Sequence, residues 1–175
     1  DGKMFRQMTY RAEMEDAQAR WFYDSKSGRV IVHFPDELSP EQHQVELTTR
    51  RRIFAPHKRG LGYIHVIGFV MEDCGNQYPK DFWSACQNGQ AGALGTRSGN
   101  HWVIRDNVIR FANGFGLDIG AEGQDSERGD DGEPSHESVG YDLIEDNVIA
   151  DNGAGGICGM SRKAVLIEGN VIERN

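Results

Sequence analysis

The clearest pattern along the chain is a short alternation of apolar and polar residues that recurs in its second half. It reads WVIRDNVI from Trp102, DLIEDNVI from Asp142 and VLIEGNVI from Val165. A weaker copy, IHVIGFVM, begins at Ile64. Alternation of this kind predicts short β-strands that bury one face. The residues expected on the buried face are Trp102, Ile104, Ile109, Ile144, Ile149, Val165, Ile167 and Ile172.

The spacing of the repeats predicts how these strands are arranged. Asn147 and Asn170 lie 23 residues apart, whereas Asn107 and Asn147 lie 40 apart because the segment AEGQDSERGDDGEPSHESVG is inserted between them. A period in the low twenties with glycine- and asparagine-rich corners is typical of a parallel β-helix, in which each repeat forms one coil of a solenoid. Equivalent residues of successive coils then lie about 4.8 Å apart. We expect Asn107, Asn147 and Asn170 to form a stacked column at a corner.

The first third of the chain has a different pattern. The strands RWFYD and RVIVHF flank the turn SKSG and predict a β-hairpin, and QVELTTRRRIF predicts a further strand. The segment MTYRAEMEDAQAR is compatible with a short helix or with irregular structure. The predicted organisation is therefore all-β: a β-rich segment over residues 1–58, the end of a β-sandwich or a cap, followed by solenoid coils over 59–175 with an inserted loop at 121–140.

Composition and charge narrow the classes of partner. The chain has 175 residues, 22 of them glycine, and a formal net charge of −8. This charge disfavours nucleic acid and anionic membrane surfaces as partners, and no apolar run is long enough to span a bilayer. Three cysteines do not make a disulfide framework. The pattern leaves open whether the chain forms a homo-oligomer.

The ends of the sequence favour a part of a longer polypeptide. It opens at DGKMFRQ without an initiator Met or a signal-like apolar segment, and it stops at VIERN inside a repeat. The cellular location stays open on this basis, with a slight preference for the cytoplasm.

Two carboxylates are the candidate catalytic groups. Asp118 lies between the inward-facing Leu117 and Ile119, so we expect its side chain on the outer face of a strand. Its neighbours one coil away, Ala93 or Gly95 and Cys158, are small and would leave space for a ligand. The alternative for Asp118 is an ordinary solvated surface aspartate.

Glu145 is expected to face outward on the next coil, between Arg105 and Glu168, and the alternative for it is a structural ladder of charged side chains. Two carboxylates on neighbouring coils are the minimum apparatus for glycosidic hydrolysis. Glu122 and Asp142 are reserve carboxylates, and Asp142 interrupts the apolar inward pattern. Aromatic and polar residues around them offer stacking faces and hydroxyl partners for an oligosaccharide substrate: Gln77, Tyr78, Trp83, Gln90, Arg97, Phe115 and His136.

No cofactor is expected. The acidic insert EGQDSERGDDGEP offers oxygen ligands that would suit a structural Ca²⁺, but it lacks the ligand spacing of an EF-hand loop. A solvated lid is the favoured interpretation of this insert. The Cys and His spacing does not indicate zinc.

The block GNQYPKDFWSACQNGQAGALGTRSGNHWVIRDNVIRFANGFGLDIGAEG, followed by GYDLIEDNVIADNGAGGICG, resembles the family-120 glycoside hydrolases, which are β-xylosidases. The resemblance covers roughly residues 60–160. It implies a right-handed parallel β-helix combined with a β-sandwich domain, and a retaining enzyme of xylan degradation. By motif position it implies that Asp118 is the nucleophile and Glu145 the acid/base.

Two other functions remain open at this stage. A polysaccharide lyase on the same scaffold would use Arg97 as a base, and a non-catalytic β-helix would only bind glycans. The fold by itself does not separate these options, because β-helices host many activities.

Overall fold

The computed structural model describes residues 3–15, 18–76, 91–120, 139–159 and 163–175. The chain divides into two compact units, Asp1–Thr48 and Thr49–Asn175. This division precedes the boundary predicted after residue 58. The reason is that the backbone N–H groups of Ile53 and Phe54 both donate to the carbonyl of Ala93, which ties this stretch to the second unit.

The first unit contains a three-stranded sheet in the order β1-β2-β3. Strands β2 (Arg20–Asp24) and β3 (Arg29–His33) form the predicted antiparallel hairpin, and β1 (Arg6–Gln7) pairs in parallel with β2. The turn is closed by Asp24, whose carboxylate accepts hydrogen bonds from the Lys26 N–H at 3.1 Å and the Ser27 hydroxyl at 2.6 Å.

The described residues of the first unit also form two short 3₁₀ helices, η1 (Arg11–Met14) and η2 (Pro40–Gln42). The segment MTYRAEMEDAQAR therefore contains one helical turn at η1. The strand predicted over QVELTTRRRIF is wrong, because this stretch forms only an isolated bridge between Phe54 and Leu94. Val45 and Leu47 are 57% and 55% exposed, so the apolar alternation here does not mark a buried face.

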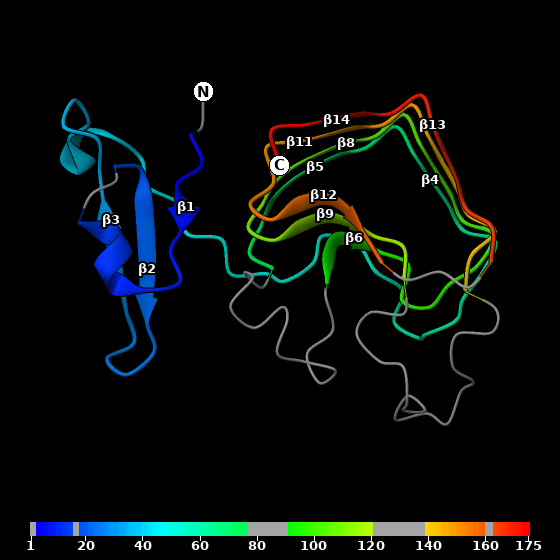
Figure 1. Cartoon of the computed structure of the whole chain (residues 1–175), viewed down its shortest axis with the longest axis horizontal. Coiled ribbons are helices and arrows are strands. Elements are labelled where there is room, and N and C mark those ends of the chain that lie inside the picture. Colours follow the sequence, from blue (N-terminus) through cyan, green and yellow to red (C-terminus); the bar gives the residue numbers. More distant parts are fainter. Residues whose placement is uncertain (1–2, 16–17, 77–90, 121–138, 160–162) are drawn as a thin grey trace. The chain divides into compact units, whose positions relative to one another are not determined.

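The described residues of the second unit form three parallel sheets, and successive passes of the chain add strands to each of them (Figure 1). We call one pass a coil. The first sheet, in the order β13-β10-β7-β4, contains β4 (His65–Ile67), β7 (Val103–Arg105), β10 (Leu143–Glu145) and β13 (Leu166–Glu168). The second, in the order β14-β11-β8-β5, contains β5 (Val70–Cys74), β8 (Val108–Ala112), β11 (Val148–Ala150) and β14 (Val171–Glu173). The third, in the order β12-β9-β6, contains β6 (Gly92–Gly95), β9 (Phe115–Asp118) and β12 (Gly155–Cys158).

This all-β arrangement is consistent with a parallel β-helix. The register is the one that the repeats predict: Ile144 pairs with Ile104 on one side and with Ile167 on the other. In the part of the chain that the structure describes, no helix is long and apolar enough to cross a membrane.

The core lies between the three sheets. Trp102, Ile104, Ile109, Ile144 and Ile149 are 0% exposed, as predicted, and Val165 is partly buried against the same cluster.

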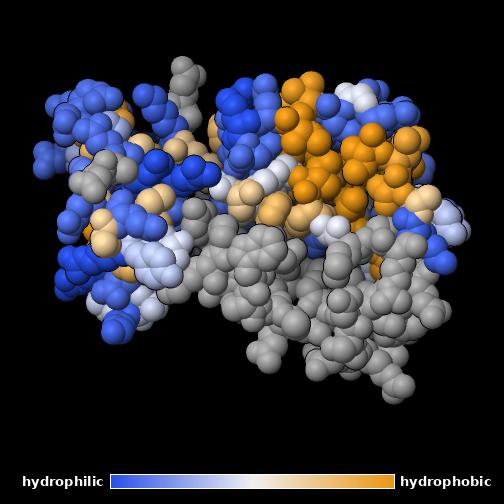
Figure 2. Space-filling model, in the orientation of Figure 1, coloured by the Kyte–Doolittle hydropathy of each residue, from blue (hydrophilic) through white to orange (hydrophobic). Residues whose placement is uncertain are grey.

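The last coil departs from this pattern. Ile167 and Ile172 were also predicted to be buried but are 46% and 48% exposed, because β13 and β14 are the edge strands of their sheets. Figure 2 shows hydrophobic surface gathered at this end of the stack.

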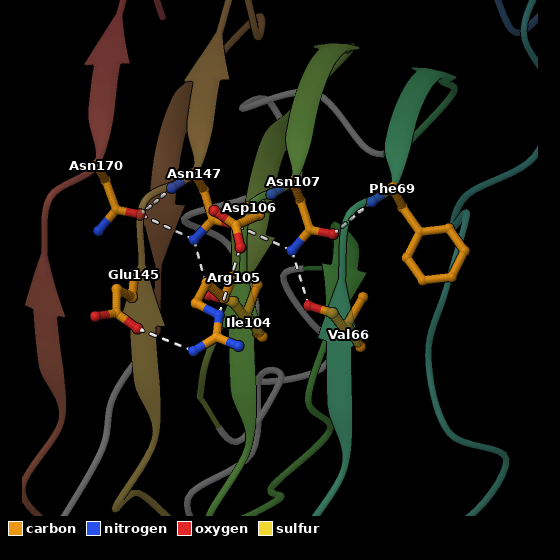
Figure 3. A network of polar contacts seen from close by, with 9 residues as sticks. All are labelled: Val66, Phe69, Ile104, Arg105, Asp106, Asn107, Glu145, Asn147 and Asn170. Atoms are coloured by element: carbon orange, nitrogen blue, oxygen red, sulfur yellow. Dashed lines mark hydrogen bonds and ion pairs between the residues drawn. The ribbon is translucent and has the colours of Figure 1, made fainter.

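The predicted asparagine column is present at the corner between the first and second sheets (Figure 3). The side-chain oxygen of Asn147 accepts hydrogen bonds from both the backbone N–H and the side-chain amide of Asn107, at 3.0 and 2.9 Å. Asn170 repeats both contacts toward Asn147 at 2.9 Å. A second column, in which Asn175 donates to Ile149 and accepts from Asn152, lies at the next corner and was not predicted.

Candidate active site

Asp118 is the last residue of β9 and lies between Gly95 of β6 and Cys158 of β12. Both neighbours are small, as predicted from the sequence. Among the described residues, no atom lies within 4 Å of a Cβ built on Gly95. The strand is held on both sides, since the Asp118 carbonyl accepts from Thr96 N–H and the Ile119 N–H donates to Cys158. Asp118 therefore has a rigid backbone with room beside it.

The side chain of Asp118 is buried, so the alternative of an ordinary solvated surface aspartate is wrong. The residue is only 1% exposed. Its Oδ1 accepts a hydrogen bond at 2.8 Å from the N–H of Gly120, two residues further along the chain. A Cβ built on Gly159 would lie 2.9 Å from the same oxygen, so Gly159 packs directly against the carboxyl group.

Glu145 is the last residue of β10 and has the predicted stacking neighbours, Arg105 and Glu168. Its Oε2 lies 3.7 Å from Arg105 Nη1, and its side chain is 27% exposed. Arg105 also approaches Asp106, with Nε 3.4 Å from Oδ2. Figure 3 shows Glu145 and Arg105 beside the asparagine column, at the corner where β10 leads into β11.

The structure places Asp118 and Glu145 in different sheets. Asp118 ends a strand of the third sheet, whereas Glu145 ends a strand of the first, and the corner at Tyr141 lies between them along the coil. A retaining glycosidase needs about 5–5.5 Å between its two carboxyl groups. Stacked positions about 4.8 Å apart would meet this requirement, but the residues stacked on Asp118 are Gly95 and Cys158.

Asp142, at the start of the segment that leads into β10, is a buried carboxyl group. It is 2% exposed, and its Oδ1 accepts a hydrogen bond from the Trp102 N–H at 2.8 Å. Its Oδ2 is buried without a hydrogen-bond partner in the described part of the chain. Burial raises the pKa of Asp142 to about 6, and the Trp102 N–H opposes this rise only in part.

Two of the predicted substrate-binding residues are described by the structure. Phe115 begins β9, and its ring lies against Gly155 of the next coil, where an added Cβ would approach the ring at 2.5 Å. Arg97 donates from Nη1 to the carbonyls of Pro56 and His57, at 3.1 and 2.8 Å, and so supports that segment. The other predicted residues lie outside the described residues: Gln77, Tyr78, Trp83, Gln90, Glu122 and His136.

The sequence analysis missed a column of exposed aromatic rings formed by Tyr63, His101 and Tyr141. The ring of His101 stacks on Tyr63 at a centroid distance of 4.6 Å and on Tyr141 at 5.0 Å. Each of these residues follows one member of the bridged series Gly62, Asn100 and Gly140. The repeat spacing was therefore a signal for this column.

Among the described residues, no group of three or more His, Cys, Asp and Glu side chains is placed to hold a metal ion. The acidic insert that was considered for Ca²⁺, residues 122–134, lies outside the described residues.

Comparison with known proteins adds one solved structure. No protein-family model and no curated protein matches the chain. The structure described as the complex of XylC with xylose matches with a TM-score of 0.56 and 20% sequence identity. The match covers 89% of this chain and 30% of that one, so this chain spans less than a third of its structural neighbour. The similarity supports the fold.

Proposed function

We propose that this chain is part of a glycoside hydrolase that removes a terminal sugar, a β-xylosyl group, from oligosaccharides. The observation that carries the proposal is the similarity of nearly the whole chain to a protein solved with xylose. The proposal includes a right-handed parallel β-helix as the scaffold and a sugar as the substrate.

Asp118 is the proposed nucleophile. A nucleophilic carboxylate must be held in one orientation, and the hydrogen bond from Gly120 together with the contact of Gly159 supports this for Asp118. Gly95 and Cys158, which flank it on the neighbouring strands, are small, and a sugar reaches this buried carboxylate only where such residues leave room. Attack by Asp118 would form a glycosyl–enzyme ester while the leaving oxygen takes a proton, and water would then release the sugar.

Glu145 is the proposed acid/base because of its motif position, and Asp142 is the competing candidate. Glu145 is paired with Arg105 and lies in another sheet. Asp142 lies before β10, nearer along the coil to the end of the third sheet, and has a pKa of about 6. A group with this pKa can both donate and accept a proton near neutral pH. The reserve carboxylate Glu122 lies outside the described residues.

The test is hydrolysis of nitrophenyl glycosides, with the xyloside and the galactoside first. We expect release of nitrophenol from the β-xyloside and a loss of at least about a thousandfold in kcat for Asp118→Asn. The assignment of Asp118 as nucleophile fails if the wild type cleaves no glycoside, or if Asp118→Asn cleaves as fast as the wild type. An unsaturated product that absorbs in the ultraviolet would indicate a lyase instead.

The acid/base is identified by comparing Glu145→Gln with Asp142→Asn on substrates with good and poor leaving groups. Loss of the acid slows cleavage of the poor leaving group far more than that of the good one, because only the poor one needs the proton. We expect this selective loss for one of the two variants. Equal and small effects of both variants would exclude both residues from the role.

A further inference from the structure

The column of Tyr63, His101 and Tyr141 lies at the corner between the third and first sheets. Its two outer rings are exposed to solvent, Tyr63 by 76% and Tyr141 by 51%. Adjacent rings are nearly parallel, with interplanar angles of 14° between Tyr63 and His101 and 23° between His101 and Tyr141. The rings therefore form a continuous stack along the direction in which the coils stack.

The backbone at all three residues has a conformation that aromatic side chains rarely adopt. The φ angles are 60°, 55° and 58° for Tyr63, His101 and Tyr141. Left-handed backbone of this kind costs roughly 1–2 kcal/mol per residue for a side chain with a Cβ. The equivalent positions at the asparagine corner carry Asp or Gly, which tolerate it well. Persistent strain in large exposed side chains is a feature associated with functional sites.

Among the described residues the stack of rings ends at Tyr141, which has no ring contact besides the one with His101 and is 51% exposed. The first face of Tyr141 contacts His101. On the other side, the Tyr141 N–H donates to the carbonyl of Ala164, which is itself exposed and carries only a methyl group. The coil that follows Tyr141 thus supplies no fourth ring at this corner.

The Tyr141 end of the stack lies at the corner that follows the candidate catalytic strand. Asp118 ends β9 and the chain then leads through Gly140 to Tyr141, whereas Cys158, stacked on Asp118, ends β12 and the chain leads to Ala164. Tyr141 and Ala164 therefore lie on neighbouring coils, and these are the coils that continue from Asp118 and from Cys158. The free face of Tyr63 belongs to the opposite end of the stack.

We infer that a pyranose ring of the substrate binds on the free face of Tyr141, above Ala164, as the fourth ring of the stack. The negative face of an aromatic ring attracts the polarised C–H groups on one face of a sugar. This inference rests on the proposed function, because it makes Tyr141 a subsite for a sugar unit next to the bond that is cleaved. It assigns to this corner the recognition of oligosaccharides rather than of single sugars.

The experiment measures binding of xylotetraose to the full chain by calorimetry, in an Asp118→Asn background that prevents turnover. We expect Tyr141→Ala to weaken binding about fivefold to tenfold, the equivalent of one aromatic stacking contact. Tyr63→Ala is the matched control: it removes the other end ring of the same stack, with the same loss of contact to His101, and should leave the affinity unchanged. Ala164→Phe, which puts a ring into the proposed position, should weaken binding as Tyr141→Ala does.

The outcomes separate this inference from the proposed function. The proposed subsite is overturned if Tyr141→Ala and Tyr63→Ala change the affinity for xylotetraose equally, or if neither changes it. It is also overturned if the chain does not bind xylotetraose. If binding depends on Tyr141 but the wild type cleaves no xyloside, the subsite stands and the hydrolase proposal fails. If hydrolysis depends on Asp118 but binding does not depend on Tyr141, the hydrolase proposal stands and the subsite fails. Thermal unfolding of each variant checks that an effect does not come from loss of the fold.

Discussion

Two corners of the same coils both contain residues with left-handed backbone, but the side chains at these residues differ. At the corner between the first and second sheets, Asp106, Asp146 and Gly169 take the left-handed conformation. Asn107 and Asn147, which follow the two aspartates, are bonded to both neighbouring coils. At the corner between the third and first sheets, the left-handed residues are aromatic and exposed. The polar side chains of the first corner are hydrogen-bonded within the fold, whereas the rings of the second corner are exposed to solvent.

The two corners differ most clearly in how the side chains of Asn147 and Asp142 are hydrogen-bonded. Both accept a hydrogen bond from a backbone N–H of the preceding coil, Asn147 from Asn107 and Asp142 from Trp102. The amide of Asn147 also donates to Ile104 and to Asn170. The second oxygen of Asp142 has no partner in the described part of the chain. An acid therefore occupies a position where an amide would satisfy the same N–H without a buried charge.

The largest effect on stability is expected for Asn147→Ala. The change leaves the Asn107 N–H without this acceptor in a buried site, which costs about 1–3 kcal/mol, and it also removes the amide that donates to the Ile104 carbonyl. We expect the free energy of unfolding to fall by about 3 kcal/mol in urea titration. Asn170→Ala, in the edge coil, is the control and should cost less than half of this. Similar losses at both positions would mean that burial does not set the strength of the column.

The next effect is a gain in stability for Asp142→Asn above pH 6. Since the pKa of Asp142 is raised to about 6 in the folded state from 3.8, the wild type loses stability as pH rises from about 4 through 6. The shift corresponds to about 2–3 kcal/mol once the group is fully charged.

Urea titrations of wild type and Asp142→Asn at pH 4 and pH 8 check this expectation. The two proteins should be equally stable at pH 4, and the variant should be more stable at pH 8. A difference that does not change between these pH values would contradict a titrating buried acid. A variant that gains stability while losing activity would mark Asp142 as a functional residue.

A smaller effect is expected at the Glu145–Arg105 pair. Its atoms are 3.7 Å apart and both side chains are partly exposed, so the pair should contribute about 0.2–1 kcal/mol. Arg105→Ala should lower the free energy of unfolding by no more than this, and 0.5 M NaCl should reduce the difference further. A loss of activity in Glu145→Gln with stability nearly unchanged would support a catalytic rather than a structural role for Glu145.

Local pattern was sufficient to predict the strands of the second unit and their register. The pairing of Ile104, Ile144 and Ile167 follows from a repeat whose side chains alternate, because a shift by one residue would turn the apolar set outward. The same repeat predicted the asparagine column and the small neighbours of Asp118. The failed strand over QVELTTRRRIF shows the limit, since alternation alone supplies no partner strand.

The sequence by itself determined which residues stack on which, because a fixed repeat brings equivalent positions of successive coils together. Only the tertiary structure decided where those columns lie around the coil. It buried the carboxyl group of Asp118 against Gly120 and Gly159, put Glu145 in another sheet, and lined up Tyr63, His101 and Tyr141 at one corner. The physical reason is that alternation specifies the face of a strand, whereas the direction of a side chain across a corner depends on the φ and ψ angles of the turn.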